Sequence, residues 1–120
     1  MLGHDITQTR AWAQLFAHYN EIGDKHMREW FEQDSGRFAK MHEHLDGMLV
    51  DYSKNRITEE SLQLLTELAD AADLAQWRER MFTGDKINYS EHRAVLHTAL
   101  RQPRDAVIEV DGVNVVAEAY

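Results

Sequence analysis

The chain has 120 residues, the length of one small domain, with 43% hydrophobic residues and a formal net charge of -8. The acidic balance argues against a general nucleic-acid binder and against attraction to anionic membrane surfaces. The sequence contains no cysteine, which excludes disulfide bonds and thiolate chemistry. Without a long apolar run or a basic, apolar N-terminal signal, we expect a cytoplasmic protein with no membrane span.

Apolar residues at helical spacing predict two helices in the first third of the chain. The first runs from about Thr7 to Ile22, and the second begins near Asp24 and ends at the turn Asp34-Ser35-Gly36. We expect the aromatic side chains of the predicted helices to pack in the core rather than to form a platform for a sugar or cofactor. These residues are Trp12, Phe16, Trp30, Phe31, Trp77 and Phe82.

Between Lys40 and Tyr52 the pattern changes to that of a short β-hairpin. Asp46-Gly47 is typical of a type I′ turn, in which both central residues need positive φ. His42 and His44 would then lie on one face of a strand. Two histidines at this spacing bind a metal only with a third ligand, and the chain has neither cysteine nor an H-E-x-x-H motif. We therefore expect no metal site.

Two further helices are predicted after the hairpin. Thr58 is typical of an N-cap residue, and Glu59 and Glu60 follow in the first turn, where the helix dipole favours negative charge. The next helix is expected around Leu74 to Phe82. Gly84 is predicted to end it, because glycine readily adopts the left-handed conformation of a helix C-terminus.

The segment Gly84–Arg101 reads GDKINYSEHRAVLHTALR. Ser90 is typical of an N-cap, and a helix from Ser90 would place Arg93, His97 and Arg101 on roughly one side. Like charges at this spacing repel, so the pattern requires an anionic counterpart. We favour internal carboxylates in a structural ion-pair network, and a bound phosphate or carboxylate is the alternative.

Pro103 ends that predicted helix, and the remaining residues favour β structure. Val107, Ile108 and Val110 predict a short strand, which Asp111-Gly112 turns toward Val113. The chain is therefore predicted to be mostly α with short β-hairpins, an α+β fold.

Two segments of the chain resemble signatures of the phosphoglucose isomerase family. One is Gly84–Arg101, and the other is Asp51–Thr58, which reads DYSKNRIT. Val110-Asp111-Gly112 is a weaker third match. Departures from the family pattern are limited to Asp85, where glutamate is commoner, and His92, where a small or polar residue is commoner. The resemblance spans about Thr7 to Val116.

The resemblance implies an aldose–ketose isomerase that interconverts glucose 6-phosphate and fructose 6-phosphate in glycolysis and gluconeogenesis. It implies a homodimeric enzyme built of α-β-α sandwiches, with no redox cofactor and no essential metal. The catalytic glutamate, histidine, lysine and arginine of the family lie beyond the matched stretch. We therefore expect this chain to be one N-terminal helical segment of such an enzyme, not a complete functional domain, and to be inactive alone.

The signature residues of this chain are expected to be structural rather than catalytic, since asparagine and serine bind backbone groups well. Partners implied by the resemblance are the rest of the isomerase, a second subunit and, in the whole enzyme, the sugar phosphate. Two alternatives remain open: a free-standing helical interaction module, and a small anion-binding protein. The signature residues considered are Ser53, Lys54, Asn55, Arg56, Lys86, Asn88, Glu91, Arg93, His97 and Arg101.

Overall fold

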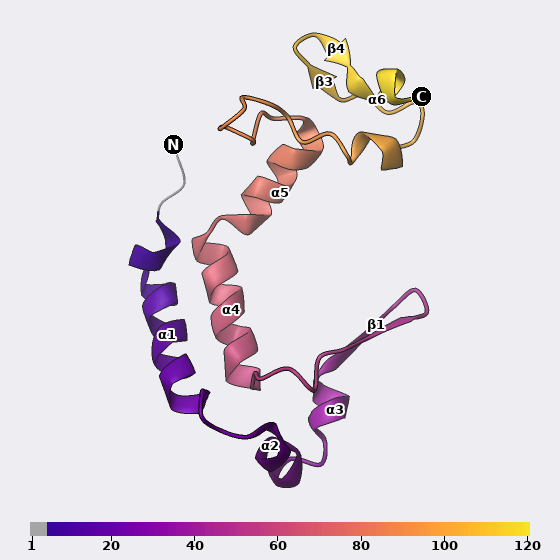
Figure 1. Ribbon diagram of the computed structural model, residues 1–120. Coiled ribbons are helices and arrows are strands. Elements are labelled where there is room, and N and C mark those ends of the chain that lie inside the picture. The colour runs from indigo at the N-terminus through magenta and orange to yellow at the C-terminus, as the bar shows by residue number, and fades with distance from the viewer. Residues whose placement is uncertain (1–4) are drawn as a thin grey trace. The chain divides into compact units, whose positions relative to one another are not determined.

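The structure is a computed structural model that describes residues 5–120 (Figure 1). Helices make up nearly half of these residues, and the strands form two antiparallel two-stranded sheets. The predicted α+β class is therefore confirmed. The polypeptide divides into two compact units, Met1–Ala71 and Ala72–Tyr120.

The first unit contains a 3₁₀ turn, four helices and one hairpin. Thr9 ends the 3₁₀ turn and caps the first α-helix, where its hydroxyl accepts a hydrogen bond from the Trp12 N–H at 3.2 Å. The second helix begins later than predicted, because its N-cap residue is His26. His26 Nδ1 accepts a hydrogen bond from the backbone N–H of Arg28. The elements are η1 (Ile6–Gln8), α1 (Arg10–Ile22), α2 (Met27–Gln33), α3 (Arg37–Lys40), β1 (His42–Leu45), β2 (Met48–Asp51) and α4 (Glu59–Ala71).

The hairpin of β1 and β2 has the predicted turn. Leu45 pairs with Met48, and φ is 47° at Asp46 and 81° at Gly47, as a type I′ turn requires. His42 and His44 lie on one face, with ring centroids 5.3 Å apart. The hairpin prediction is therefore confirmed.

Helices α1 and α4 lie side by side and antiparallel in the first unit (Figure 1). Trp30, Met41 and Leu64 are its buried apolar residues. The prediction that the helix aromatics fill a core is wrong for several of them, because no described element of their own unit covers the outer side of these helices. Phe16 is 59% exposed, Phe82 44% and Trp12 38%.

The second unit packs around Ala99, Ile108, Val115 and Val116. Gly84 ends α5 with φ 85°, so the predicted glycine stop is confirmed. The Asp111-Gly112 turn joins β3 to β4, and a helix follows directly. The elements are α5 (Leu74–Thr83), η2 (Ala99–Arg101), β3 (Glu109–Val110), β4 (Val113–Asn114) and α6 (Val115–Ala119).

The predicted helix from Ser90 to Arg101 is wrong. Asn88 and Arg93 instead exchange backbone hydrogen bonds of 3.1 and 3.0 Å, which close a loop. The Asn88 side chain accepts the N–H of Glu91, and His92 has φ 56°, which no right-handed helix contains. Asparagine thus competes with the helix for backbone groups, and only one 3₁₀ turn remains at the end of the segment.

The longest helices, α1 and α4, have 13 residues each. Within residues 5–120 no helix combines the length and the apolar character that a bilayer crossing needs.

Candidate functional site

The signature loop after β2 is organised by the buried side chain of Arg37, which is only 4% exposed. Its Nε donates to the carbonyl oxygen of Ser53 at 2.7 Å. One Nη donates to the carbonyl oxygens of Asn55 at 3.0 Å and Ile57 at 2.8 Å. The guanidinium also lies over the ring of Trp30, 5.2 Å from its centroid. A planar group with several fixed donors is suited to hold three carbonyls of one loop at once.

The start of the same loop is fixed by a local hydrogen bond. The Asp51 carboxylate accepts the backbone N–H of Ser53 at 2.8 Å, and Ser53 is 1% exposed. Bonding to the Ser53 hydroxyl and backbone N–H lowers the pKa of the Asp51 carboxyl below its usual 3.8. Asp51 is therefore ionised at neutral pH, and its charge stabilises the turn.

A polar cluster joins the end of α1 to the start of α4. Thr58 and Ser61 form a reciprocal capping arrangement, because each side-chain oxygen accepts the backbone N–H of the other residue, at 3.2 and 2.9 Å. His18 Nε2 lies 2.8 Å from the Ser61 Oγ, and His18 Nδ1 lies 3.6 Å from a carboxylate oxygen of Glu60. The predicted N-cap role of Thr58 is confirmed.

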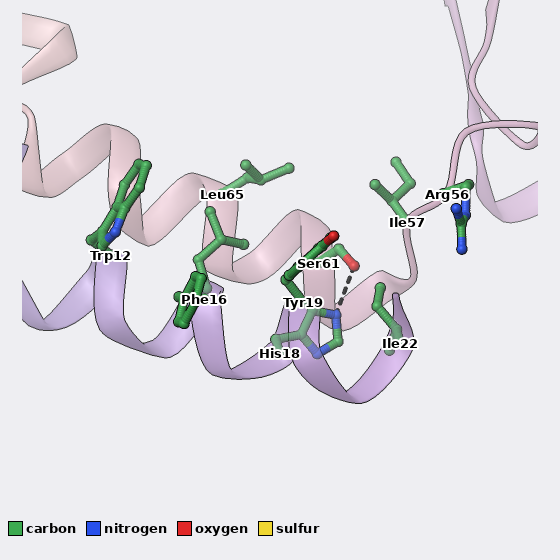
Figure 2. A pocket seen from close by; sticks show the side chains of 10 residues that line it. Trp12, Phe16, His18, Tyr19, Ile22, Arg56, Ile57, Ser61 and Leu65 are labelled. Carbon is green, nitrogen blue, oxygen red and sulfur yellow. Dashed lines mark hydrogen bonds between the residues drawn. The ribbon is translucent and has the colours of Figure 1, made fainter. Parts of the chain in front are cut away.

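An apolar groove of about 300 Å³ lies beside this cluster (Figure 2). Helices α1 and α4 supply most of its walls, and we call it the α1–α4 groove. Arg56 lies at one end and donates to the carbonyl oxygens of Gly23 and Lys25, which ties the signature loop to the end of α1. The groove is lined by Trp12, Leu15, Phe16, His18, Tyr19, Ile22, Arg56, Ile57, Ser61 and Leu65.

The second signature segment is held by short-range polar contacts. Asn88 Oδ1 accepts the Ser90 hydroxyl at 2.9 Å, and its Nδ2 donates to Glu91 at 3.2 Å. Lys86 Nζ lies 2.7 Å from an Asp111 carboxylate oxygen, in the β3–β4 turn. These contacts link side chains within the second unit.

The predicted cationic stripe of Arg93, His97 and Arg101 does not form, because the helix that would align these residues is absent. Arg93 contributes its backbone to the loop closure with Asn88. Arg101 donates to the backbone carbonyl of His97 at 3.3 Å. The helical geometry on which both the favoured ion-pair network and the alternative anion site depended is therefore absent.

The remaining signature residues, Lys54 and Asn55, are exposed on the loop that Arg37 holds. His42 Nδ1 donates a hydrogen bond to the Phe38 carbonyl oxygen at 2.7 Å, and its ring stacks on the Phe38 ring. Between residues 5 and 120 no three His, Asp or Glu side chains gather closely enough to hold a metal ion. Among the signature residues, the side chains of Arg56, Asn88 and Arg101 bond to backbone groups.

Two organising residues, His18 and Arg37, were missed by the sequence reasoning. His18 lies three residues after Leu15 and four before Ile22, a spacing that indicates the packed side of α1. Ser61, three residues after Thr58, has the spacing of a capping box. No signal in the sequence marks Arg37, because its role depends on carbonyl groups 16 to 20 residues away.

The comparisons with known proteins cover the same two signature segments. Residues 51–120 match the family model described as "Phosphoglucose isomerase". The chain is 53% identical over 115 residues to a glucose-6-phosphate isomerase of Deinococcus radiodurans, which covers 96% of the chain. It is 50% identical over 116 residues to glucose-6-phosphate isomerase 2 of Chromobacterium violaceum and 51% identical over 116 residues to the isomerase of Mycobacterium avium, and each match covers 97% of the chain.

The chain spans only 21% of the length of each of these curated relatives. The family match, by contrast, extends over more than half of the chain and includes both signature segments. The chain belongs to the phosphoglucose isomerase family.

Proposed function

We propose that this chain forms the N-terminal part of an aldose–ketose isomerase that interconverts glucose 6-phosphate and fructose 6-phosphate. The observation that carries the proposal is the identity of 50–53% to glucose-6-phosphate isomerases over nearly the whole chain. Both signature segments lie within this match. In the cell, such an enzyme would act in glycolysis and gluconeogenesis in the cytoplasm.

The part played by this segment is structural. Arg37 holds the first signature loop, and Asn88 closes the second. Aldose–ketose isomerisation needs a carboxylate base at C2, acid–base groups for ring opening and a cation for the developing negative charge. In the proposed enzyme these groups come from the remaining polypeptide, so the 120-residue chain alone is inactive.

The whole enzyme is proposed to be a homodimer of α-β-α sandwiches, with this chain as one helical segment of each subunit. Exposed aromatic residues support this, because an incomplete part of a larger fold leaves apolar surface uncovered. Phe16 and Tyr19 on α1 and Phe82 on α5 are such side chains.

The test is a chimera in which this chain replaces the matched segment of the Deinococcus radiodurans enzyme. A coupled assay that oxidises the glucose 6-phosphate formed from fructose 6-phosphate measures turnover. We expect an active chimera, and no saturable turnover from the isolated chain. A soluble, folded chimera without turnover would contradict the proposed function, and turnover by the isolated chain would contradict the structural role.

A further inference from the structure

We infer that the α1–α4 groove is the surface on which the remaining polypeptide of the isomerase docks, through an apolar helical face. This inference rests on the proposed function, because the occupant is the part of the enzyme that lies outside the matched segment. It names the surface by which the 120-residue segment is held to the rest.

The groove exposes side chains that folded proteins normally cover. Phe16 is 59% exposed, Tyr19 64% and Leu65 42%, and all three line the groove. Two of the polar groups that border it are already engaged, since the Ser61 hydroxyl contacts His18 and the Arg56 guanidinium bonds to Gly23, whereas His18 Nδ1 has no hydrogen-bond partner among the described residues. What the groove offers to an occupant is therefore mainly apolar and aromatic area.

The total accessible surface points in the same direction. The chain exposes 9322 Å² at a mass of 14.0 kDa. Two separate globules of half this mass would together expose only about 8,100 Å² by the usual scaling of surface with mass. The excess means that the chain leaves more surface uncovered than two compact globules of this total mass would.

The geometry of the groove fits a helix. Helices α1 and α4 are antiparallel, and each has 13 residues, which gives a length of about 20 Å at 1.5 Å per residue. Figure 2 shows Trp12 and Phe16 along α1 and Leu65 on α4, which form two walls with an open side. A third helix with aliphatic residues at positions i, i+3, i+4 and i+7 can place them between these walls.

The relatives indicate which polypeptide supplies that helix. In each relative the matched segment makes up 21% of the full-length protein. About four-fifths of the same polypeptide is therefore tethered to this segment. Tethering gives a docking face an effective concentration of roughly millimolar, which favours an intramolecular occupant over a second copy or a separate protein.

The experiment compares Phe16→Gln in two contexts, the isolated 120-residue chain and the chimera with the remainder of the Deinococcus radiodurans enzyme. Phe16 is mostly exposed in the isolated chain, so the substitution should shift its Tm by less than about 2 °C. In the chimera the ring would be buried, and we expect a fall in Tm of several degrees. Ala17→Gln is the matched control, because Ala17 is exposed on the same helix and lies outside the groove.

An equal, small effect of Phe16→Gln in both contexts would overturn the docking, as would a wild-type chimera that fails to fold. A concentration-dependent dimer of the isolated chain that Phe16→Gln abolishes would identify a second copy as the occupant and would also overturn it. Turnover separates this inference from the proposed function. A chimera that shows the expected difference in Tm but no turnover would support the docking and contradict the proposed function. An active chimera without this difference in Tm would support the proposed function and contradict the docking.

Discussion

Arg37 Nε lies 2.7 Å from the carbonyl oxygen of Ser53, and this bond fixes a family-signature loop from a helix that is not part of the signature. The arginine is buried, and its partners are backbone carbonyls rather than a carboxylate. The loop therefore depends on a residue that no local sequence pattern marks.

Replacing Arg37 with methionine should destabilise the first unit by roughly 3–5 kcal/mol, because three carbonyl oxygens lose their donor in a buried place. Chemical denaturation followed by circular dichroism measures the change. Arg28→Met is the control, since Arg28 is exposed on α2. A loss below about 1 kcal/mol for Arg37→Met would show that water replaces the guanidinium without cost.

Asp51 should make stability depend on acid pH. Its folded pKa lies below 3.8, so its contribution is fully present above the unfolded value and is lost as pH falls through the lower folded value. We expect Tm to fall between about pH 5 and pH 3 in the wild type and to fall less in Asp51→Asn. Identical pH profiles for the two proteins would contradict this contribution.

Gly84→Ala should destabilise the second unit by about 2 kcal/mol, because φ is positive and the added methyl group meets crowded side chains. A Cβ at this position would lie 2.9 Å from Ile108 Cγ2 and 3.0 Å from Val110 Cγ2. Gly112→Ala measures the cost of the positive φ alone, since φ there is 80° and no atom lies within 4 Å of the added Cβ. Denaturant midpoints should rank wild type above Gly112→Ala, and Gly112→Ala above Gly84→Ala.

Lys86→Gln should change the free energy of unfolding by less than about 1 kcal/mol, because an exposed ion pair contributes little. Lys86 is 46% exposed and Asp111 71%. The same substitution in the chimera tests whether this signature lysine affects turnover by a route other than stability. A loss of stability well above 1 kcal/mol in the isolated chain would mean that the Asp111 contact is stronger than its exposure implies.

Local chemistry explains which elements could be predicted. Asp46-Gly47 and Gly84 each require positive φ, so the sequence alone places a hairpin turn and a helix end there. Thr58 marks a helix start for a similarly local reason. These features need only neighbouring residues.

The failures have the opposite cause. Ser90 to Arg101 has the composition of a helix, but the Asn88 side chain captures the backbone N–H of Glu91 and a left-handed His92 follows. The outer aromatic of α1, Phe16, has the spacing of a core residue, yet the described residues of its unit do not cover it. Spacing identifies an apolar face but does not say which polypeptide covers it.

The contact between His18 and Ser61 also has a consequence for the order of folding. The two residues are 43 positions apart, whereas each hairpin closes over a turn of two residues. Closing the longer loop costs more chain entropy, so the hairpins are expected to form before α4 reaches α1. During synthesis on the ribosome, α1 therefore emerges before α4 and its aromatic side chains stay in water until α4 packs against them. In this interval the nascent chain is most prone to aggregation and to chaperone binding.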